Sequence, residues 1–566
     1  MTRRGDVVAG LAAMALALAA AIVVLELWDA DLRVPFTYTG DGTLNLLFIK
    51  DVLENGWYLE NSRLGAPHGL ELYDYPVING ETLNLLFFRI LGLGTEDPAL
   101  VMNLFFLLTF PLTALTAFAV LRRLPVSRGI SLVVAVLFAL LPYHFMRGEA
   151  HLFLAAYYAV PLGAYLAIAV FRGDTLFGHW RPTLITAVMC TVVATASGSG
   201  YYAVFTVLLV ALAALLRFVV RREGQALVAG GALVAAITAV SLVQLAPTIV
   251  YRAANGANDE VAKRYWFESE NYSLRLTNLL LPVDGHRIDR LARLKAEYVE
   301  KTPQTEARSA TLGIVASLGF LWLIGIALAA VAGAGRRYTL GLHAGLAALT
   351  VGAVLTATTG GFSTLIAVAW PQIRAWNRLS TFIAFFSLVA VALLLGRLQR
   401  RLREPVFALL LCAVLVVGFV DQTSKSFIPP YAATKAAWQG DEAFFSALDD
   451  RLPPGSMVVE LPYEPFPEPE AGPVGLYEPA KPYLHSDSLR WSYGAMRGRP
   501  DNWAAANASK PPRELVAAAR TAGFAGILLD RAAYGAQAAA VEAEFRKLLP
   551  PEPLPHADGR WVFLSV

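Results

Sequence analysis

Residues 40–51 read GDGTLNLLFIKD, and six of them, TLNLLF, recur unchanged at residues 82–87. An acid stands close before each copy, Asp41 in the first case and Glu81 in the second. Both copies are apolar, but the apolar runs around them are too short to cross a membrane. The repeat therefore predicts two short helices that lie along the edge of a membrane rather than through it.

The two predicted helices cover residues 42–54 and 82–93, and both carry charge, as at Lys50 and Arg89. Segments of this mixed kind lie at the membrane interface as amphipathic helices. We expect Glu81 to begin the second helix, because a negative charge suits the positive end of the helix dipole.

The composition places the rest of the chain in a membrane. The sequence has 566 residues, of which 56% are hydrophobic and 16% charged, and its mean hydropathy is +0.50. That charged fraction is well below the roughly 25% of soluble domains. The net charge of +3 is too small to suggest a nucleic-acid partner. These values indicate a polytopic α-helical membrane protein.

Hydropathy predicts about eleven spanning helices. We place them at residues 7–27, 99–120, 128–146, 151–171, 182–198, 201–219, 226–248, 311–333, 338–357, 378–396 and 405–421. Alternate loops are short and basic, which is typical of the cytoplasmic side. The cations in those loops are Arg3, Arg4, Arg122, Arg123, Arg128, Arg172, Arg181, Arg217, Arg221, Arg222, Arg336, Arg337, Arg397, Arg400, Arg401 and Arg403.

This alternation predicts a multi-pass protein with its N-terminus in the cytoplasm. An odd number of helices then places the C-terminal part outside the cytoplasmic membrane. Alanine- and arginine-rich usage suggests a bacterial source, so the membrane is the bacterial inner membrane. We expect function on the outer face, because the long loops lie on that side.

Two domains are expected. Residues 1–421 form the transmembrane domain, which includes a long outer loop at 28–98. Residues 422–566 are richer in charge and proline, and they contain patterns typical of strands at 457–463 and 561–566. Residues 512–530 read as a helix, a glycine turn and a strand. The tail therefore predicts an extracytoplasmic α/β domain.

Asp41 is the first candidate catalytic residue. It lies between Gly40 and Gly42, and glycine lets a ligand approach the backbone closely. A carboxylate just outside the membrane is suited to accept a proton from a sugar hydroxyl. The alternative is a structural role as the N-cap of the following helix.

Asp74 and Tyr75 form a second candidate in the same outer loop, within ELYDYPVINGE (71–81). Asp74 could be a second acid near Asp41, or bind the acceptor together with Tyr75, whose ring suits the apolar face of a sugar. The alternative is an ordinary turn, in which Asp and Pro are common.

A third cluster, YHFMRGEAH (143–151), places His144, Arg147, Glu149 and His151 at one membrane edge. Arg147 and His144 could hold a phosphate, since arginine presents a fixed fork of donors. Glu149 could bind the acceptor, and Glu149 with His151 could be part of a metal site. Zinc needs three or four ligands, however, and the sequence has no HExxH pattern. The alternative is that all four are interfacial anchors.

Further candidates lie at other outer turns. Arg374 and Arg378 share a helical face and could capture a phosphate head group, or they could be interfacial anchors. The polar-aromatic loop at 483–494 could form an acceptor-binding lip or an interdomain contact. Candidate substrate contacts are Tyr38, Tyr201, Tyr202 and His485.

The layout resembles the GT-C superfamily of membrane glycosyltransferases, in a bacterial branch. The resemblance rests on a first spanning helix, an outer loop with TYTGDG and YDYP, many further helices, and an α/β tail outside. It is looser in NYSLRLTNLLLP (271–282), NRLS and VVELP.

The resemblance implies an inverting transfer from a polyprenyl-phosphate-linked sugar. Asp41 matches the family's first-loop acid, which acts as catalytic base or holds the acceptor. Many members have paired acids there, whereas this sequence has one, so Asp74 could supply the partner. No cofactor is required by the sequence, and a divalent metal would be compatible with it.

We therefore expect a glycosyltransferase that acts on a glycan, lipid or protein acceptor within membrane lipid. Two other classes stay open. A lipid-linked sugar transporter or flippase would carry charges at mid-membrane and a symmetric repeat. A non-catalytic assembly factor for envelope polymers would tolerate replacement of Asp41.

Overall fold

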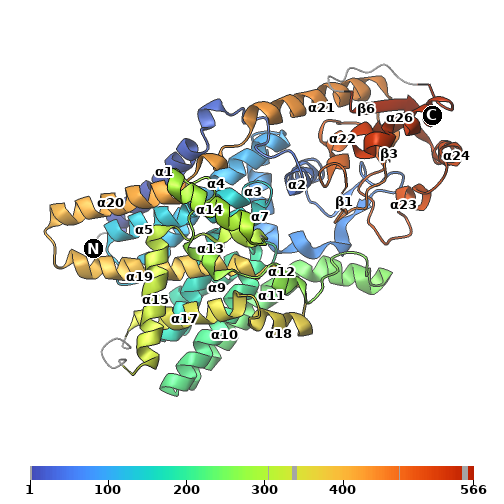
Figure 1. The fold of residues 1–566 in the computed structure, drawn as a ribbon. Coiled ribbons are helices and arrows are strands. Elements are labelled where there is room, and N and C mark those ends of the chain that lie inside the picture. The colour runs from blue at the N-terminus through green and yellow to red at the C-terminus, as the bar shows by residue number, and fades with distance from the viewer. Residues whose placement is uncertain (1–2, 304, 334–340, 471, 551–558) are drawn as a thin grey trace.

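The structure is a computed structural model, and it describes residues 3–303, 305–333, 341–470, 472–550 and 559–566. Within these residues, nine helices are long and apolar enough to cross a membrane. These spans are Arg4–Val24, Pro98–Leu121, Arg128–Arg147, Leu152–Arg172, Tyr201–Arg221, Gly224–Asn255, Ile314–Val331, Trp376–Gln399 and Glu404–Gln422. The protein is thus a multi-pass, mostly helical membrane protein (Figure 1).

The predicted number of eleven spans is not reproduced in the described residues. The helices predicted at 182–198 and 338–357 correspond to α9 (Trp180–Thr195) and α17 (Leu342–Ala357). Each has 16 residues, which is roughly 24 Å of helix and shorter than the roughly 30 Å hydrocarbon core. The basic pair Arg336 and Arg337 lies outside the described residues.

Several spans are built from shorter helices. The third span contains α5 (Arg128–Ala139) and α6 (Pro142–Arg147), and the fourth contains α7 (Leu152–Ala155) and α8 (Val160–Arg172). The others are α1 (Arg3–Val24), α4 (Pro98–Leu121), α10 (Tyr201–Arg221), α11 (Gly224–Asn255), α15 (Ile314–Val331), α19 (Ser380–Gln399) and α20 (Glu404–Gln422).

The repeated hexapeptide forms two helices, as predicted. The first copy lies in α2 (Asp41–Asn55) and the second in α3 (Thr82–Gly92). The expectation that α2 lies along the interface is wrong, because its residues 42–52 are all buried. Helix α22 (Lys481–Leu484), from the C-terminal part, covers α2, and the Lys50 ammonium donates to the carbonyl oxygens of Leu484 (3.1 Å) and Ser486 (2.9 Å).

The C-terminal part holds a four-stranded sheet in the order β4-β3-β5-β6. Its strands are β3 (Met457–Leu461), β4 (Arg490–Trp491), β5 (Phe524–Asp530) and β6 (Trp561–Ser565). Strand β3 runs parallel to β4 and β5, and β6 is antiparallel to β5. The strands predicted at 457–463 and 561–566 are confirmed.

The two faces of this sheet pack against different neighbours, because side chains alternate along a strand. Val458 and Leu528 belong to the large core that includes the spanning helices. Val459 and Ile527 belong to a separate core with α24 (Pro512–Ala522) and α26 (Ala538–Arg546). The domain boundary at residue 421 stays a prediction, since one core runs across it.

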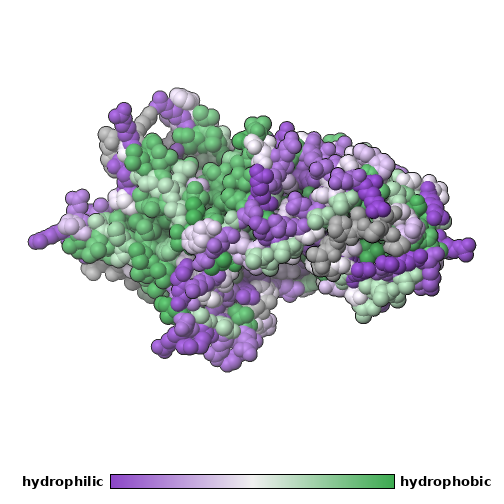
Figure 2. Space-filling view, turned by 90° about the horizontal axis from the view of Figure 1, so that it is seen from above, coloured by the Kyte–Doolittle hydropathy of each residue, from purple (hydrophilic) through white to green (hydrophobic). Residues whose placement is uncertain are grey.

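The surface follows this division. Figure 2 shows a broad hydrophobic surface over the half of the molecule built from spanning helices, and a mostly hydrophilic surface over the half that holds the sheet. Helix α21 (Tyr431–Arg451) connects α20 to the sheet along one side (Figure 1). The loop at residues 28–98, which the sequence predicts to be outer, carries Asp41.

Candidate active site

Asp41 is the first residue of α2, and Gly40 before it has φ 56° and ψ −137°. The two flanking positions require glycine for different structural reasons. Gly40 adopts a backbone conformation that residues with a side chain rarely reach. A Cβ on Gly42 would lie 2.9 Å from the Thr37 carbonyl oxygen, so Gly42 permits close packing within the loop. The glycines thus shape the turn that presents Asp41.

The Asp41 carboxylate is 45% exposed. Within the described residues it accepts no hydrogen bond, so it does not act as a side-chain cap. Partial burial raises its pKa, and the positive charges of Arg378 and Arg374 oppose that rise. The result is a carboxylate that holds a proton more readily than an ordinary aspartate.

His151 is the nearest partner of Asp41, with 3.8 Å between its Nε2 and the carboxylate Oδ2. Burial lowers the pKa of His151 to about 3, and the charge of Arg147 adds to this effect. The ring is therefore neutral near pH 7, and it leaves Asp41 without an ionic partner.

Arg147 and Arg378 meet at one acid, Glu306. Arg378 contacts Glu306 Oε1 through Nε (2.9 Å) and Nη2 (2.7 Å), and an Arg147 Nη1 hydrogen bond reaches the same oxygen. Burial would raise the pKa of Glu306, but the two arginines outweigh it and hold that pKa well below its usual range. Arg147 also donates to Ser309 Oγ (2.8 Å) and Asn377 Oδ1 (3.2 Å).

Glu306 was missed by the sequence analysis. It begins η5 (Glu306–Ala310), at the end of the outer loop that precedes α15. An acid shortly before a spanning helix on the outer side is the signal that could have found it. Its role in the structure is to hold two arginines, which come from α6 and from the start of the span at Trp376–Gln399.

The three arginines differ in accessibility. The side chains of Arg147 and Arg378 are buried, whereas Arg374 is 35% exposed. Arg374 donates to Glu268 Oε1 (2.9 Å), and the Arg378 guanidinium lies 4.1 Å from the Tyr201 ring centroid. Arg374 is thus the cation that a ligand could reach first. The Arg378 guanidinium is held against the Tyr201 ring.

His144 does not bind a phosphate in this arrangement, contrary to expectation. It is fully buried, its Nε2 lies 2.7 Å from Thr109 Oγ1, and its Nδ1 lies 2.8 Å from the Ala139 carbonyl oxygen. Phe110 stacks on the ring at 3.7 Å. Both ring nitrogens are used in helix packing.

Glu149 and Tyr202 are also structural. Glu149 Oε2 accepts a hydrogen bond from the Thr37 backbone N–H (2.9 Å), which fixes the loop just before Asp41. Burial raises the pKa of Glu149 to about 8. The Tyr202 hydroxyl donates to the Leu154 carbonyl oxygen (2.5 Å) and is fully buried, so neither side chain is placed to contact a substrate.

Asp74 is not the partner of Asp41. It is buried and closed in by Arg499 (2.6 and 3.0 Å), Arg252 (3.2 Å) and Asn258 (3.2 Å). Burial would raise its pKa, but the hydrogen bonds from Arg499 and its neighbours lower it overall. Tyr75 is buried next to it, and the charges of Asp41 and Arg374 both act on its hydroxyl.

Tyr38 and His485 contact each other rather than an open site. The Tyr38 hydroxyl donates to Asp441 Oδ2 (2.9 Å) and lies 2.8 Å from His485 Nε2. The Lys481 ammonium lies 4.1 Å from the Tyr38 ring centroid. These residues join the first outer loop to the C-terminal part, so their role is interdomain packing.

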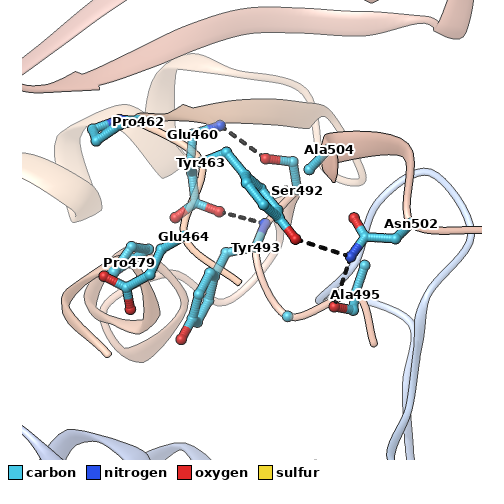
Figure 3. Close-up of a pocket in the computed structure, with 11 residues that line it drawn as sticks. Glu460, Pro462, Tyr463, Glu464, Pro479, Ser492, Tyr493, Ala495, Asn502 and Ala504 are labelled. Atoms are coloured by element: carbon cyan, nitrogen blue, oxygen red, sulfur yellow. Dashed lines mark hydrogen bonds between the residues drawn. The ribbon is translucent and has the colours of Figure 1, made fainter. Parts of the chain in front are cut away.

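The predicted loop at 483–494 also borders a recess beside the end of β3 (Figure 3). The volume of the recess, including the solvent at its opening, is about 260 Å³. Glu460 Oε2 accepts from the Tyr493 N–H (2.8 Å), whereas Glu460 Oε1 and the Tyr493 hydroxyl have no partner in the described structure. Burial raises the pKa of Glu464, on the same wall, to about 7. None of the residues that line this recess belongs to the arginine cluster formed by Arg147, Arg374 and Arg378.

The residues present do not fit a metal site made by protein alone. The described ranges contain no group of three or more His, Cys, Asp or Glu side chains placed to share an ion. Asp41 and His151 lie near each other, but the Glu306 carboxylate is taken by two arginines. One oxygen of Glu149, a candidate ligand beside His151, accepts the Thr37 backbone N–H.

These features define a multi-pass membrane protein with a partly exposed acid, Asp41, and a cluster of three arginines, and its fold resembles that of the GT-C glycosyltransferases. It is similar to arabinofuranosyltransferase AftD from Mycobacteria, with 16% identity, a TM-score of 0.51, and coverage of 100% of this chain and 40% of that chain. It is also similar to the archaeal oligosaccharyltransferase AglB from Archaeoglobus fulgidus, solved with an inhibitory peptide and a dolichol-phosphate, with 12% identity, a TM-score of 0.46, and coverage of 98% and 74%.

The chain belongs to the family described as a domain of unknown function (DUF6311), which it matches over residues 83–423. That range contains the arginine cluster and Glu306 but begins after Asp41. No curated protein matches the sequence. The chain spans about 40% of the length of the mycobacterial chain, so the likeness shows the fold. It confirms the GT-C resemblance predicted from the sequence.

Proposed function

We propose that this protein is an inverting glycosyltransferase on the outer face of the bacterial cytoplasmic membrane. It moves a sugar from a polyprenyl-phosphate donor to a hydroxyl of an envelope glycan, lipid or protein acceptor. The observation that carries the proposal is the exposed, unpaired carboxylate of Asp41, held beside Arg374 and Arg378. A base next to an anion-binding cluster is the minimum that such a transfer needs.

Asp41 acts as the general base in this scheme. Its raised pKa makes its ionised form a stronger base than an ordinary aspartate carboxylate. Asp41 takes the proton of the acceptor hydroxyl as that oxygen attacks the anomeric carbon. One C–O bond forms, the bond from the anomeric carbon to the phosphate oxygen breaks, and the electron pair leaves with the polyprenyl phosphate.

Arg374 and Arg378 stabilise the leaving phosphate. Arginine matches phosphate oxygens with two parallel donors, and the charge on those oxygens grows as the bond breaks. Arg374 is the more exposed of the two and binds the donor first. The two terminal nitrogens of Arg147 already donate to Glu306, Ser309 and Asn377, so Arg147 positions Glu306 rather than touching the donor.

The test is transfer by the purified full-length protein. A panel of polyprenyl-phosphate sugars is incubated with envelope glycan acceptors, and the product is measured for the wild type, Asp41→Asn and the control Glu96→Gln. Glu96 is an exposed acid of the same outer loop. We expect Asp41→Asn to lose about 10²- to 10⁴-fold in rate and the control to lose none.

Two results would contradict the proposal at different levels. Full activity in Asp41→Asn would remove Asp41 as the base. An absence of transfer from any polyprenyl donor by the wild type would reject the enzyme and favour a transporter or an assembly factor.

A further inference from the structure

Three consecutive aromatic residues stand exposed beside the arginine cluster. Tyr265, Trp266 and Phe267 are 47–51% exposed and lead directly into α12 (Glu268–Asn271). The Tyr265 and Phe267 rings stack on each other at 5.4 Å, so the three form one surface rather than three separate side chains. Large exposed apolar surfaces of this kind mark sites of interaction.

A second exposed segment adjoins them. Helix α18 (Phe362–Ala369) presents Phe362, Leu365 and Val368 to the outside, each more than half exposed. Glu270 of α12 joins the two segments, since it accepts the Gly360 N–H (2.9 Å) and the Thr364 hydroxyl. We call the combined surface the apolar lip; its members are Tyr265, Trp266, Phe267, Phe362, Leu365 and Val368.

The apolar lip continues the surface that faces lipid. Helix α18 follows α17 after only residues 358–361, and Leu355 near the end of α17 is also exposed. Near the C-terminal end of the α11 span, which precedes the aromatic residues, Ile249 and Val250 are exposed. Tryptophan and tyrosine at the point where a chain leaves the membrane are typical of the head-group region.

The same segment is tied to the arginine cluster. Glu268, the residue after Phe267, accepts from Arg374 Nη1 (2.9 Å). The Tyr272 carbonyl oxygen accepts from Asn377, through its backbone N–H (3.1 Å) and its Nδ2 (2.9 Å). On the other side, an Arg264 hydrogen bond to Glu468 links the segment to the C-terminal part. The apolar lip and Arg374 are therefore parts of one connected structure.

We propose that the apolar lip is seated in the outer lipid leaflet and is the place where the hydrocarbon tail of a lipid phosphate crosses from the bilayer to Arg374. An apolar surface contiguous with the spanning helices carries the tail. The partly exposed Arg374, which pairs with Glu268 directly after Phe267, receives the phosphate. The placement of the apolar lip in lipid is inferred from the exposure of its side chains and from its continuity with the spanning helices, independently of the proposed function. The passage of a donor tail rests on the proposed function.

The seating is tested by measuring depth in the membrane. A nitroxide label is attached at Trp266→Cys in full-length protein that carries Cys190→Ala and Cys412→Ser, reconstituted in phosphatidylcholine–phosphatidylglycerol vesicles. Arg513→Cys, an exposed position on α24, is the matched control. We expect the label at 266 to collide mainly with oxygen and the label at 513 mainly with a water-soluble nickel complex. Equal nickel access at both positions would overturn the seating and indicate a protein or glycan partner instead.

The passage of the tail is tested by donor kinetics. The triple variant Tyr265→Ser, Trp266→Ser, Phe267→Ser is compared with the wild type on a long-chain polyprenyl-phosphate sugar and on a short, water-soluble analogue. We expect KM for the long donor to rise about tenfold, with kcat and the KM of the short analogue unchanged. An equal change for both donors would overturn the inference. Absence of transfer in the wild type would reject the proposed function while leaving the depth measurement intact.

Discussion

Asp41 and Asp74 come from the same outer loop, but the structure places them in opposite settings. Asp74 is enclosed by two arginines and an asparagine, and these donors lower its pKa. Asp41 is 45% exposed and lacks a hydrogen-bond donor within the described residues, and burial raises its pKa. Two acids that look alike in the sequence therefore differ in hydrogen bonding, in exposure and in the direction of their pKa shifts.

The difference shows what separates an anchoring carboxylate from a reactive one. A carboxylate whose lone pairs are all used by buried donors stabilises the fold and has little affinity for a proton. A carboxylate that is partly desolvated and left unpaired keeps that affinity and can exchange a proton with a ligand. Breaking each arrangement in turn should affect stability in one case and turnover in the other.

The largest expected effect is on stability, from Asp74→Ala. This change leaves Arg499 and Arg252 without their common partner, which costs about 3 kcal/mol for a buried pair. The free energy of unfolding is measured by detergent denaturation in mixed micelles, followed by tryptophan fluorescence. Turnover of the folded fraction should stay unchanged. A loss of turnover without a loss of stability would assign Asp74 to the reaction and erase its contrast with Asp41.

Arg374→Gln should lower turnover strongly without unfolding the protein. Loss of one donor to a charge that grows in the transition state costs about 10²-fold in kcat. Arg308→Gln is the matched control, because Arg308 also lies on an outer loop and pairs with an acid, Asp284, at 2.9 Å. Equal rates for the two variants would show that Arg374 is an anchor, the alternative left open by the sequence.

Sequence patterns predicted much of this molecule where the signal is local. Hydropathy located the spanning helices, and the glycines around Asp41 marked an acid that is partly exposed and accepts no hydrogen bond in the described residues. Arg374 and Arg378 were proposed as phosphate ligands because two cations stand at the start of a helix, and this role stays a prediction. Each of these signals lies within a few residues of the feature that it predicts.

The failures concern contacts between distant segments. Glu306 meets Arg147 across 159 positions, and no spacing rule connects them. His144 and Glu149 lie in the same turn as Arg147, yet one faces the helix core and the other the loop at Thr37. The sequence did not predict the burial of α2, because α22, one of the helices that pack on it together with α3 and α4, comes more than 400 residues later.

Buried acids should also make stability fall as pH rises. Burial raises the pKa of Glu149, Glu81 and Asp51 to about 8, so each holds its proton in the folded state over a range where the unfolded chain has lost it. Their stabilisation is complete below the unfolded pKa, near 4.5 or lower, and is lost as pH rises toward 8. Glu149→Gln should remove about 3.5 kcal/mol of the stability change between pH 5 and pH 8. Melting curves across that range check it, and an unchanged slope would show that Glu149 ionises freely.

The smallest expected effect is from His151→Asn, and it sharpens the assignment of Asp41 as the titrating group. The pKa of His151 is lowered to about 3, so the ring stays neutral from pH 5 to pH 8 and adds no titration to the rate. Because the base must be ionised, kcat/KM should fall as pH drops through the raised pKa of Asp41, in the wild type and in His151→Asn alike. We expect the rate at pH 7 to change by less than about threefold, since the 3.8 Å contact is too long for a strong hydrogen bond. If kcat/KM of His151→Asn no longer fell at low pH, the titrating base would be the His151 ring and not Asp41.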